Sequence, residues 1–208
     1  GEQARPAVID TAAVMAGLRR AQFHEEVGAR TRVPGVATGL GLNGAGGDVL
    51  SVEAAAMAGK GGLVLTGQLG DVMKESARIA LTYVRSHASE LGIDEGTFDG
   101  REFHVHVPAG AIPKDGPSAG VTMVAALTSL LTGRPLKNTV GMTGEVTLQG
   151  GVLPTGGPKQ KVLAAHAAGL TEVILPERNA PDLDDVPADV RERMQFHAVK
   201  TADEMLAL

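Results

Sequence analysis

The 208-residue sequence contains no cysteine and no tryptophan. The absence of cysteine excludes disulfide bonds, thiolate zinc sites and a cysteine nucleophile, and it is typical of a reducing compartment. One tyrosine and four phenylalanines are its only aromatic residues, so we expect a core of aliphatic residues and methionine. No apolar run approaches the roughly 18 residues of a membrane span, and the first residues show no signal-peptide pattern. We therefore expect a cytoplasmic protein without a membrane partner.

Positive charge is also scarce. The sequence has 19 basic and 24 acidic residues, which gives a net charge of -5. A site for a phosphate backbone needs clustered lysine and arginine, so nucleic acid is not an expected partner. Hydrophobic residues make up 43% and charged residues 21% of the chain, a composition that excludes a disordered tail.

The periodicity of apolar residues changes along the chain. Residues 1–33 are interpreted as an N-terminal segment with a mildly helical stretch at 11–20. Short β-type runs separated by glycines between 35 and 67 predict a hairpin or meander. The next stretch, 72–91, has the spacing of an amphipathic helix, with Gly92 as its stop.

The second half of the chain alternates between strand and helix patterns. The predicted elements are strands at 103–107, 140–148, 172–175 and 195–199, and helices at 117–131, 158–168, part of 182–194, and 202–206. Strands first and alternating units afterwards predict one α+β domain over 34–208.

Two glycine-rich stretches match nucleotide-binding motifs only in part. Residues Gly39 to Gly44 fit the spacing GxGxxG, but a dinucleotide site needs a helix directly afterwards, and the following residues are β-type. A hairpin turn explains this stretch. Gly59-Lys60 is no P-loop, because Ala54 occupies the position of the motif's first glycine. Any ATPase associated with this chain must lie outside it.

His104 and His106 are two residues apart on a predicted strand and therefore share one face. This spacing suits a metal ion, but a third ligand of similar quality is not evident and cysteine is absent. We expect no metal site and interpret both as partly buried structural histidines. They can also assist catalysis, because their strand leads into the next segment.

That next segment, Pro113-Lys-Asp-Gly-Pro-Ser-Ala-Gly, is the most informative of the chain. Ser118 lies in the first turn of a predicted helix whose direction Pro117 fixes. Unpaired amides and the positive end of the helix dipole can stabilise the oxyanion that forms when a serine attacks a carbonyl. An N-cap serine needs the same position. Local chemistry leaves both interpretations open.

A nucleophilic serine needs a base. His104 or His106 can serve together with Asp115 as a triad. A lysine can also serve if burial lowers its pKa toward neutrality. Lys161 has alanines three, four and seven residues later, so its side of the helix is able to pack inward. The alternative for Lys161 is a solvated surface lysine.

Several motifs in fixed order resemble the C-terminal proteolytic domain of the ATP-dependent Lon protease family. They are Pro113-Lys-Asp-Gly-Pro-Ser118-Ala-Gly, Met142-Thr143-Gly144-Glu145-Val-Thr-Leu and Leu153-Pro-Thr-Gly156-Gly157-Pro-Lys-Gln-Lys161-Val-Leu-Ala-Ala-His. Upstream stretches of the same family begin at Leu50, Gly67 and His104. The resemblance covers about residues 34–207.

The resemblance implies that Ser118 is the nucleophile and Lys161 the general base of a Ser-Lys dyad, with Thr143 bonded to the lysine. It also implies further positions around the dyad. The supporting residues are Asp115, His106 and Glu53, and the loop and oxyanion residues are Gly116, Pro117 and Ala119. Pro158 and Gln160 stand where the family commonly has leucine and glutamate, and neither change removes a member of the dyad.

The resemblance further implies the ribosomal protein S5 domain 2-like α+β fold and a homohexameric ring. The expected function is a serine endopeptidase of protein quality control that hydrolyses unfolded, damaged or tagged proteins. ATP and Mg²⁺ belong to an ATPase module outside these residues, from which 1–33 would lead in, so no cofactor is expected here. The alternative is a related domain that binds or oligomerises without catalysis. The presence of both Ser118 and Lys161 favours the enzyme.

Overall fold

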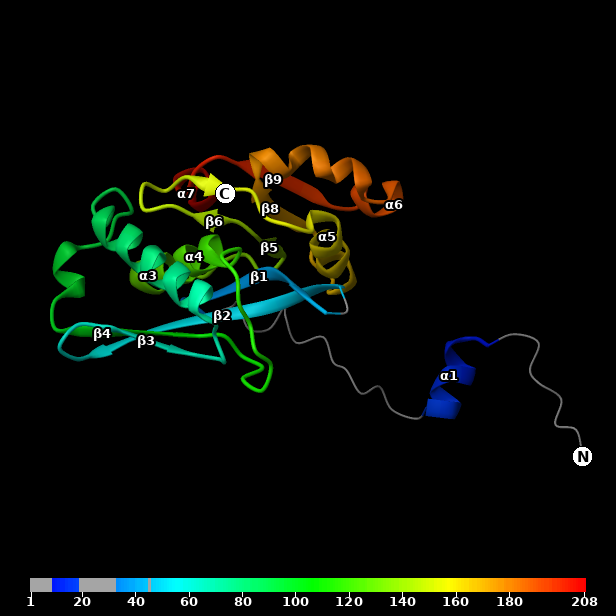
Figure 1. Ribbon diagram of the computed structural model, residues 1–208, viewed down its shortest axis with the longest axis horizontal. Coiled ribbons are helices and arrows are strands. Elements are labelled where there is room, and N and C mark those ends of the chain that lie inside the picture. The colour runs from blue at the N-terminus through cyan, green and yellow to red at the C-terminus, as the bar shows by residue number, and fades with distance from the viewer. Residues whose placement is uncertain (1–8, 19–32, 45) are drawn as a thin grey trace, which may run out of the picture.

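The computed structural model describes residues 9–18, 33–44 and 46–208 (Figure 1). Its first element is α1 (Thr11–Leu18), none of whose residues is buried. This helix agrees with the helical stretch expected at 11–20. The rest of the expected N-terminal segment, apart from residues 9, 10 and 33, lies outside the described residues.

The centre of the fold is a seven-stranded mixed sheet. Its strands, in spatial order, are β3 (Leu63–Thr66), β4 (Arg101–His106), β2 (Gly46–Ala58), β1 (Val36–Asn43), β5 (Val140–Met142), β8 (Glu172–Pro176) and β9 (Gln195–Val199). The pairs β1–β2 and β2–β4 are antiparallel. The other pairs are parallel, so most of the sheet is parallel. β6 (Glu145–Val146) and β7 (Val152–Leu153) form a separate small sheet.

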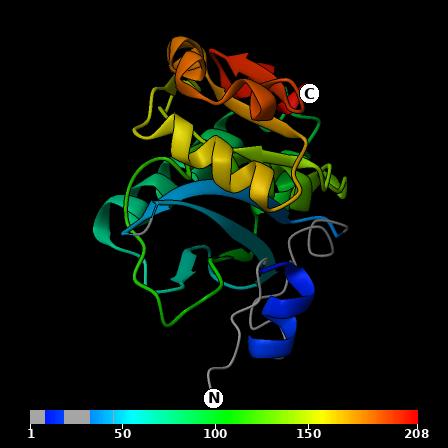
Figure 2. The same cartoon turned by 90° about the vertical axis from the view of Figure 1, so that its right-hand side faces the viewer.

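Helices cover both faces of the sheet, as the alternation along β1 shows. Ala37 belongs to a core cluster shared with α3 (Asp71–Ser86) and α4 (Gly120–Thr132). Leu40 points the other way, into a second cluster with α5 (Pro158–Ala167). Figure 2 shows α5 lying across the β1–β2 hairpin. The remaining helical elements are η1 (Glu95–Phe98), η2 (Glu177–Asp185), α6 (Ala188–Arg191) and α7 (Ala202–Leu206).

The core is largely aliphatic, as the composition predicts. Tyr83, Phe98 and Phe103 are its aromatic members within the described ranges. Helix α4 is buried over its first ten residues, so it is the central helix of the fold. In the described part of the chain, no helix is long and apolar enough to cross a membrane.

The structure corrects several predicted element boundaries. The helix predicted for 72–91 ends at Ser86, and Gly92 instead closes the turn that follows, where its N–H bonds the Ser89 oxygen at 3.1 Å. Of the predicted hairpin or meander, the structure has the hairpin, formed by β1 and β2, because β4 lies between β2 and β3. The strand predicted for 140–148 breaks after Met142, because β6 leaves the main sheet to pair with β7.

Candidate active site

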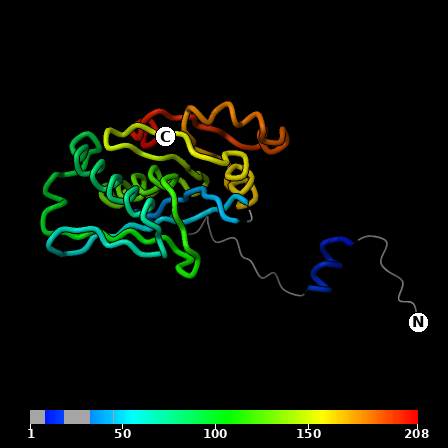
Figure 3. The backbone as a smooth tube through the Cα atoms, in the orientation of Figure 1, coloured from blue at the N-terminus to red at the C-terminus, as the bar shows by residue number. Residues whose placement is uncertain are grey.

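Ser118 lies in the turn immediately before α4. The segment between β4 and α4 is a long loop (Figure 3). The helix begins at Gly120 and its N-cap residue is Ala119, not Ser118. This placement corrects the prediction that Ser118 lies in the first turn, and it removes the capping interpretation. The Ser118 side chain is half-buried. Within the described ranges, its hydroxyl has no hydrogen-bond partner, so it is available to a substrate.

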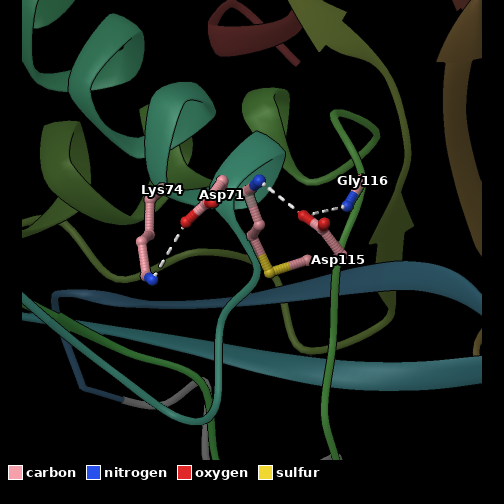
Figure 4. A network of polar contacts seen from close by, with 5 residues as sticks. Asp71, Lys74, Asp115 and Gly116 are labelled. Atoms are coloured by element: carbon pink, nitrogen blue, oxygen red, sulfur yellow. Dashed lines mark hydrogen bonds and ion pairs between the residues drawn. The ribbon is translucent and has the colours of Figure 1, made fainter.

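Asp115 fastens the loop to the start of α3 (Figure 4). Its Oδ1 accepts hydrogen bonds from the Met73 N–H at 2.9 Å and from the Gly116 N–H at 2.8 Å. Met73 lies in the first turn of α3, whose N-cap residue, Gly70, provides no side-chain cap. Asp115 therefore supplies the missing cap from a distant part of the chain. The carboxylate fixes the loop that carries the nucleophile candidate.

Lys114 also holds the same loop through hydrogen bonds. Its Nζ donates to the carbonyl oxygens of Gly67, Ala109 and Ile112 at 3.0, 2.9 and 2.9 Å. Ala109 has a left-handed φ of 63°, which a non-glycine residue holds only when its surroundings impose it. Three carbonyl acceptors on one ammonium supply that constraint.

A backbone N–H group near Ser118 can bind an oxyanion only if it is not already hydrogen-bonded. The Gly116 N–H is already bonded to Asp115, and Pro117 has no N–H. In the described part of the chain, the N–H groups of Ser118 and Ala119 donate to no protein acceptor. Of the three expected loop residues, Ala119 is the one that offers a free donor.

Lys161 lies in the first turn of α5 and is only 2% exposed. The sequence of this turn explains its geometry. Gly157, the N-cap residue, has a left-handed φ of 65°, and Pro158 is tolerated in the first turn because its missing N–H would be unpaired there. The inward-facing interpretation of Lys161 is confirmed, and the solvated alternative is wrong.

The Lys161 amine is held by two hydroxyl groups. Nζ donates to Thr143 Oγ1 and to Thr155 Oγ1, each at 3.0 Å. Within the described ranges no carboxylate bonds Nζ. Burial lowers the pKa of the Lys161 ammonium from its ordinary 10.5 to about 8. A sizeable fraction of this lysine is therefore a neutral base in mildly alkaline solution.

Backbone hydrogen bonds bring Ser118 next to the segment that holds Lys161. The Gly144 N–H donates to the backbone carbonyl oxygen of Ser118 at 2.9 Å, and the Val121 N–H donates to the backbone carbonyl oxygen of Gly144 at 3.1 Å. Thr143, one residue earlier, bonds Nζ. The end of strand β5 at Met142 thus places Thr143 and Gly144 beside Lys161 and Ser118. No hydrogen bond within 3.5 Å joins Ser118 Oγ to Lys161 Nζ among the described residues.

The two histidines lie on β4. His104 and His106 each bond Thr66 Oγ1, at 2.9 and 2.7 Å. Glu53 is the cross-strand partner of His106 on β2. In the described ranges neither histidine bonds Ser118 or Asp115, so no triad is assembled. No group of three or more metal-ligating side chains occurs in these ranges either.

Two residues of the site were missed by the sequence analysis. Thr155 bonds Lys161, and buried Asn179 bonds Thr155 on both its N–H and its carbonyl oxygen. Thr155 lies in the motif that begins at Leu153, six residues before Lys161, and this position is the signal that could identify it. Asn179 comes from η2, and nothing in the spacing indicates that it reaches the site.

A serine hydroxyl beside a helix N-terminus and a buried, partly neutral lysine are the components of a hydrolase that uses a lysine as its base. The comparisons with known proteins agree. The family model of the Lon protease (S16) C-terminal proteolytic domain matches residues 8–208. The chain therefore belongs to the Lon protease family, as its proteolytic domain.

Individual relatives support the same assignment. Lon protease of Salinispora arenicola (strain CNS-205) is 62% identical over 203 residues, which are 98% of this chain and 26% of that protein. Lon protease of Mycolicibacterium smegmatis is 58% identical over 205 residues, 99% of this chain and 26% of that protein. The chain spans about a quarter of the length of these curated relatives.

Proposed function

We propose that this domain hydrolyses peptide bonds through a dyad in which Ser118 is the nucleophile and Lys161 the general base. The observation that carries the proposal is the burial of Lys161 between two hydroxyl groups, with its pKa lowered to about 8. A lysine held in this way is partly neutral near physiological pH and can accept a proton. A lysine with an ordinary pKa is almost entirely charged there.

The proposed reaction proceeds in two halves. Neutral Lys161 accepts the Ser118 Oγ proton as Oγ bonds to the scissile carbonyl carbon, and the N–H group of Ala119 donates to the resulting oxyanion. The lysyl ammonium then protonates the leaving amine, and the C–N bond breaks to leave an acyl-serine ester. Lys161, neutral again, deprotonates a water that attacks the ester. Ser118 recovers its proton as the acid product departs.

Proton transfer requires Oγ and Nζ to come within about 3 Å, a distance that catalytic groups often reach only with substrate bound. Asp115 and Lys114 support the loop in its present position, and Thr143 orients the base. His106 bonds Thr66, and Glu53 is the cross-strand partner of His106, so we assign neither of them a step in this reaction.

For the whole protein, we propose the role that the Lon family implies. Unfolded, damaged or tagged proteins would be delivered by ATP hydrolysis in an ATPase module with bound Mg²⁺, outside this domain, in the cytoplasm. Domains would assemble as a homohexameric ring around a chamber, with residues 1–33 leading toward the ATPase. The mixed sheet with helices on both faces is compatible with the ribosomal protein S5 domain 2-like fold, which we propose here.

The test is cleavage of a short fluorogenic peptide, which needs no unfolding, by this chain and by three variants. We expect Ser118→Ala and Lys161→Arg to be inactive, since guanidinium does not deprotonate in the working range. Lys159→Arg, two residues away and exposed, is the matched control and should retain activity. Equal rates for the parent and Ser118→Ala would exclude the serine mechanism. An active Lys161→Arg variant would point to a histidine base.

A further inference from the structure

Lys161 has one hydroxyl partner that the family resemblance implies, Thr143, and one that it does not, Thr155. The second bond is as short as the first, 3.0 Å from Nζ to Oγ1. The two threonine oxygens are themselves 3.3 Å apart. Thr155 therefore belongs to the immediate environment of the proposed base.

We propose that Thr155 and Asn179 form a positioning pair that directs the lone pair of neutral Lys161 toward Ser118. The inference rests on the proposed function, because it assigns these residues to the Ser118–Lys161 reaction. In the described part of the chain, the hydrogen bonds of both residues do not include Ser118, so both act through the lysine.

The argument begins with the valence of the amine. A neutral lysine carries two N–H donors and one lone pair, and only the lone pair can accept the serine proton. Two hydroxyl acceptors engage both N–H groups, which leaves the lone pair in a direction away from both threonines. With Thr143 alone, Nζ could rotate about the last bond of the side chain. The second acceptor stops that rotation.

Thr155 can perform this task only if it is itself fixed, because it lies between β7 and α5, outside any helix or strand. Asn179 fixes it. The Thr155 N–H donates to Asn179 Oδ1 at 2.9 Å, and Asn179 Nδ2 donates to the backbone carbonyl oxygen of Thr155 at 3.1 Å. The second Nδ2 hydrogen donates to Asp182 Oδ2 at 2.7 Å, which fixes the orientation of the amide. Asn179 is 5% exposed, so water does not compete for these bonds.

A positioning role for Thr155 and Asn179 predicts an effect on the pKa of Lys161 that a merely structural role does not predict. A hydroxyl oxygen binds an ammonium more strongly than a neutral amine, because the bond is charge-assisted. Removing the Thr155 hydroxyl should therefore lower the pKa of Lys161 further, so that more of the base is neutral at a given pH. Activity should nevertheless fall, because the lone pair is no longer oriented. Greater deprotonation with a lower rate distinguishes positioning from titration.

The experiment compares the parent chain with Thr155→Val, Thr155→Ser and Asn179→Ala. The control Thr82→Val removes an exposed threonine hydroxyl that bonds its own helix at Arg78. Lys161 is titrated directly by NMR with ε-¹³C-lysine, and its signal is assigned by its loss in Lys161→Met. The rate at which a fluorophosphonate modifies Ser118 is measured across the same pH range.

We expect Thr155→Val to titrate at a lower pH than the parent and to lower the plateau rate roughly tenfold or more. Asn179→Ala should change both in the same direction but less. Thr155→Ser, which keeps the hydroxyl, and Thr82→Val should both match the parent. The NMR arm needs no catalysis, so it separates failure of this inference from failure of the proposed dyad, which Ser118→Ala tests.

An unchanged or raised Lys161 pKa in Thr155→Val would overturn the positioning role, as would a lowered pKa with an unchanged rate. If Thr155→Val does not fold, Thr155→Ser and Asn179→Ala still test the proposal. A Thr155→Ser variant whose Ser118 is modified more slowly than in the parent would overturn it. An Asn179→Ala variant with the Lys161 titration and the modification rate of the parent would overturn it as well.

Discussion

Replacing Lys161 with methionine should stabilise the chain at neutral pH while it abolishes activity. The pKa of this lysine is lowered from 10.5 to about 8 by burial. The folded state therefore binds this proton less tightly than the unfolded state. Between about pH 8 and 10.5 the unfolded chain holds more protons, so stability rises with pH there. Below pH 8 the full cost of burying the charge is present, on the order of 3 kcal/mol.

Methionine has a similar length, no charge and no donor. It removes that cost but also the two bonds to Thr143 and Thr155, each worth about 1 kcal/mol. The two hydroxyls can then bond one another, because their oxygens are already 3.3 Å apart. We expect a net gain of about 1–3 kcal/mol near pH 7. The gain should fall by about 3 kcal/mol as the pH rises from about 7 to 10.5, and so vanish or reverse, because the folded lysine is then neutral and the unfolded one is losing its proton.

The assay is urea unfolding of the parent, Lys161→Met and the exposed control Lys159→Met, at pH values from about 6 to 10.5. Ionisation of other groups is common to parent and variant and cancels in the difference. The control should differ little from the parent at every pH. A Lys161→Met chain that is less stable than the parent near pH 7, or a stability difference that does not vary with pH, would refute the reasoning.

Three further predictions concern the pH dependence of cleavage and the hydrogen bonds of Asp115 and Tyr83. Peptide cleavage should rise with pH with a midpoint near 8, since the Lys161 ammonium must lose its proton; a profile of kcat/KM that is half-maximal near pH 6.5, the usual histidine value, would instead indicate a histidine base. Asp115→Ala should lower the free energy of unfolding by about 1 kcal/mol, because α3 loses the side-chain cap that Asp115 supplies. Urea unfolding beside Asp115→Asn, which keeps the acceptor oxygen, should show the difference. Tyr83→Phe should cost about 1–2 kcal/mol, since the buried hydroxyl donates to Asp203 at 2.6 Å, and a parental midpoint in urea would show that this bond contributes nothing.

Local patterns predicted much of the fold. The hairpin between 35 and 67, the strand at 195–199 and most of the helix predicted for 117–131 follow from alternation and helical spacing. The strand order could not be predicted in this way. β4 lies between β2 and β3 because of long-range pairing, which leaves no mark on local periodicity.

In the site, too, local sequence predicts some features and tertiary contacts decide the others. Ser118 and Lys161 became candidates because each lies in a distinctive local context, a Pro/Gly loop before a helix and an alanine-lined helix face. The resemblance to the Lon family then favoured the catalytic interpretation of both. Their environment could not be predicted in this way. Asp115 caps α3 across 42 residues of sequence, and Asn179 holds Thr155 across 24. Such contacts depend on tertiary packing, so a single sequence does not reveal them.

The central claim is that Lys161 activates Ser118, and the most direct measurement is mass-spectrometric mapping of a fluorophosphonate adduct on the parent and on Lys161→Met. The account predicts an adduct on Ser118 of the parent that forms faster as the pH rises through about 8, and little or none on the variant. An adduct on another residue, or equal rates at Ser118 in both proteins, would contradict it.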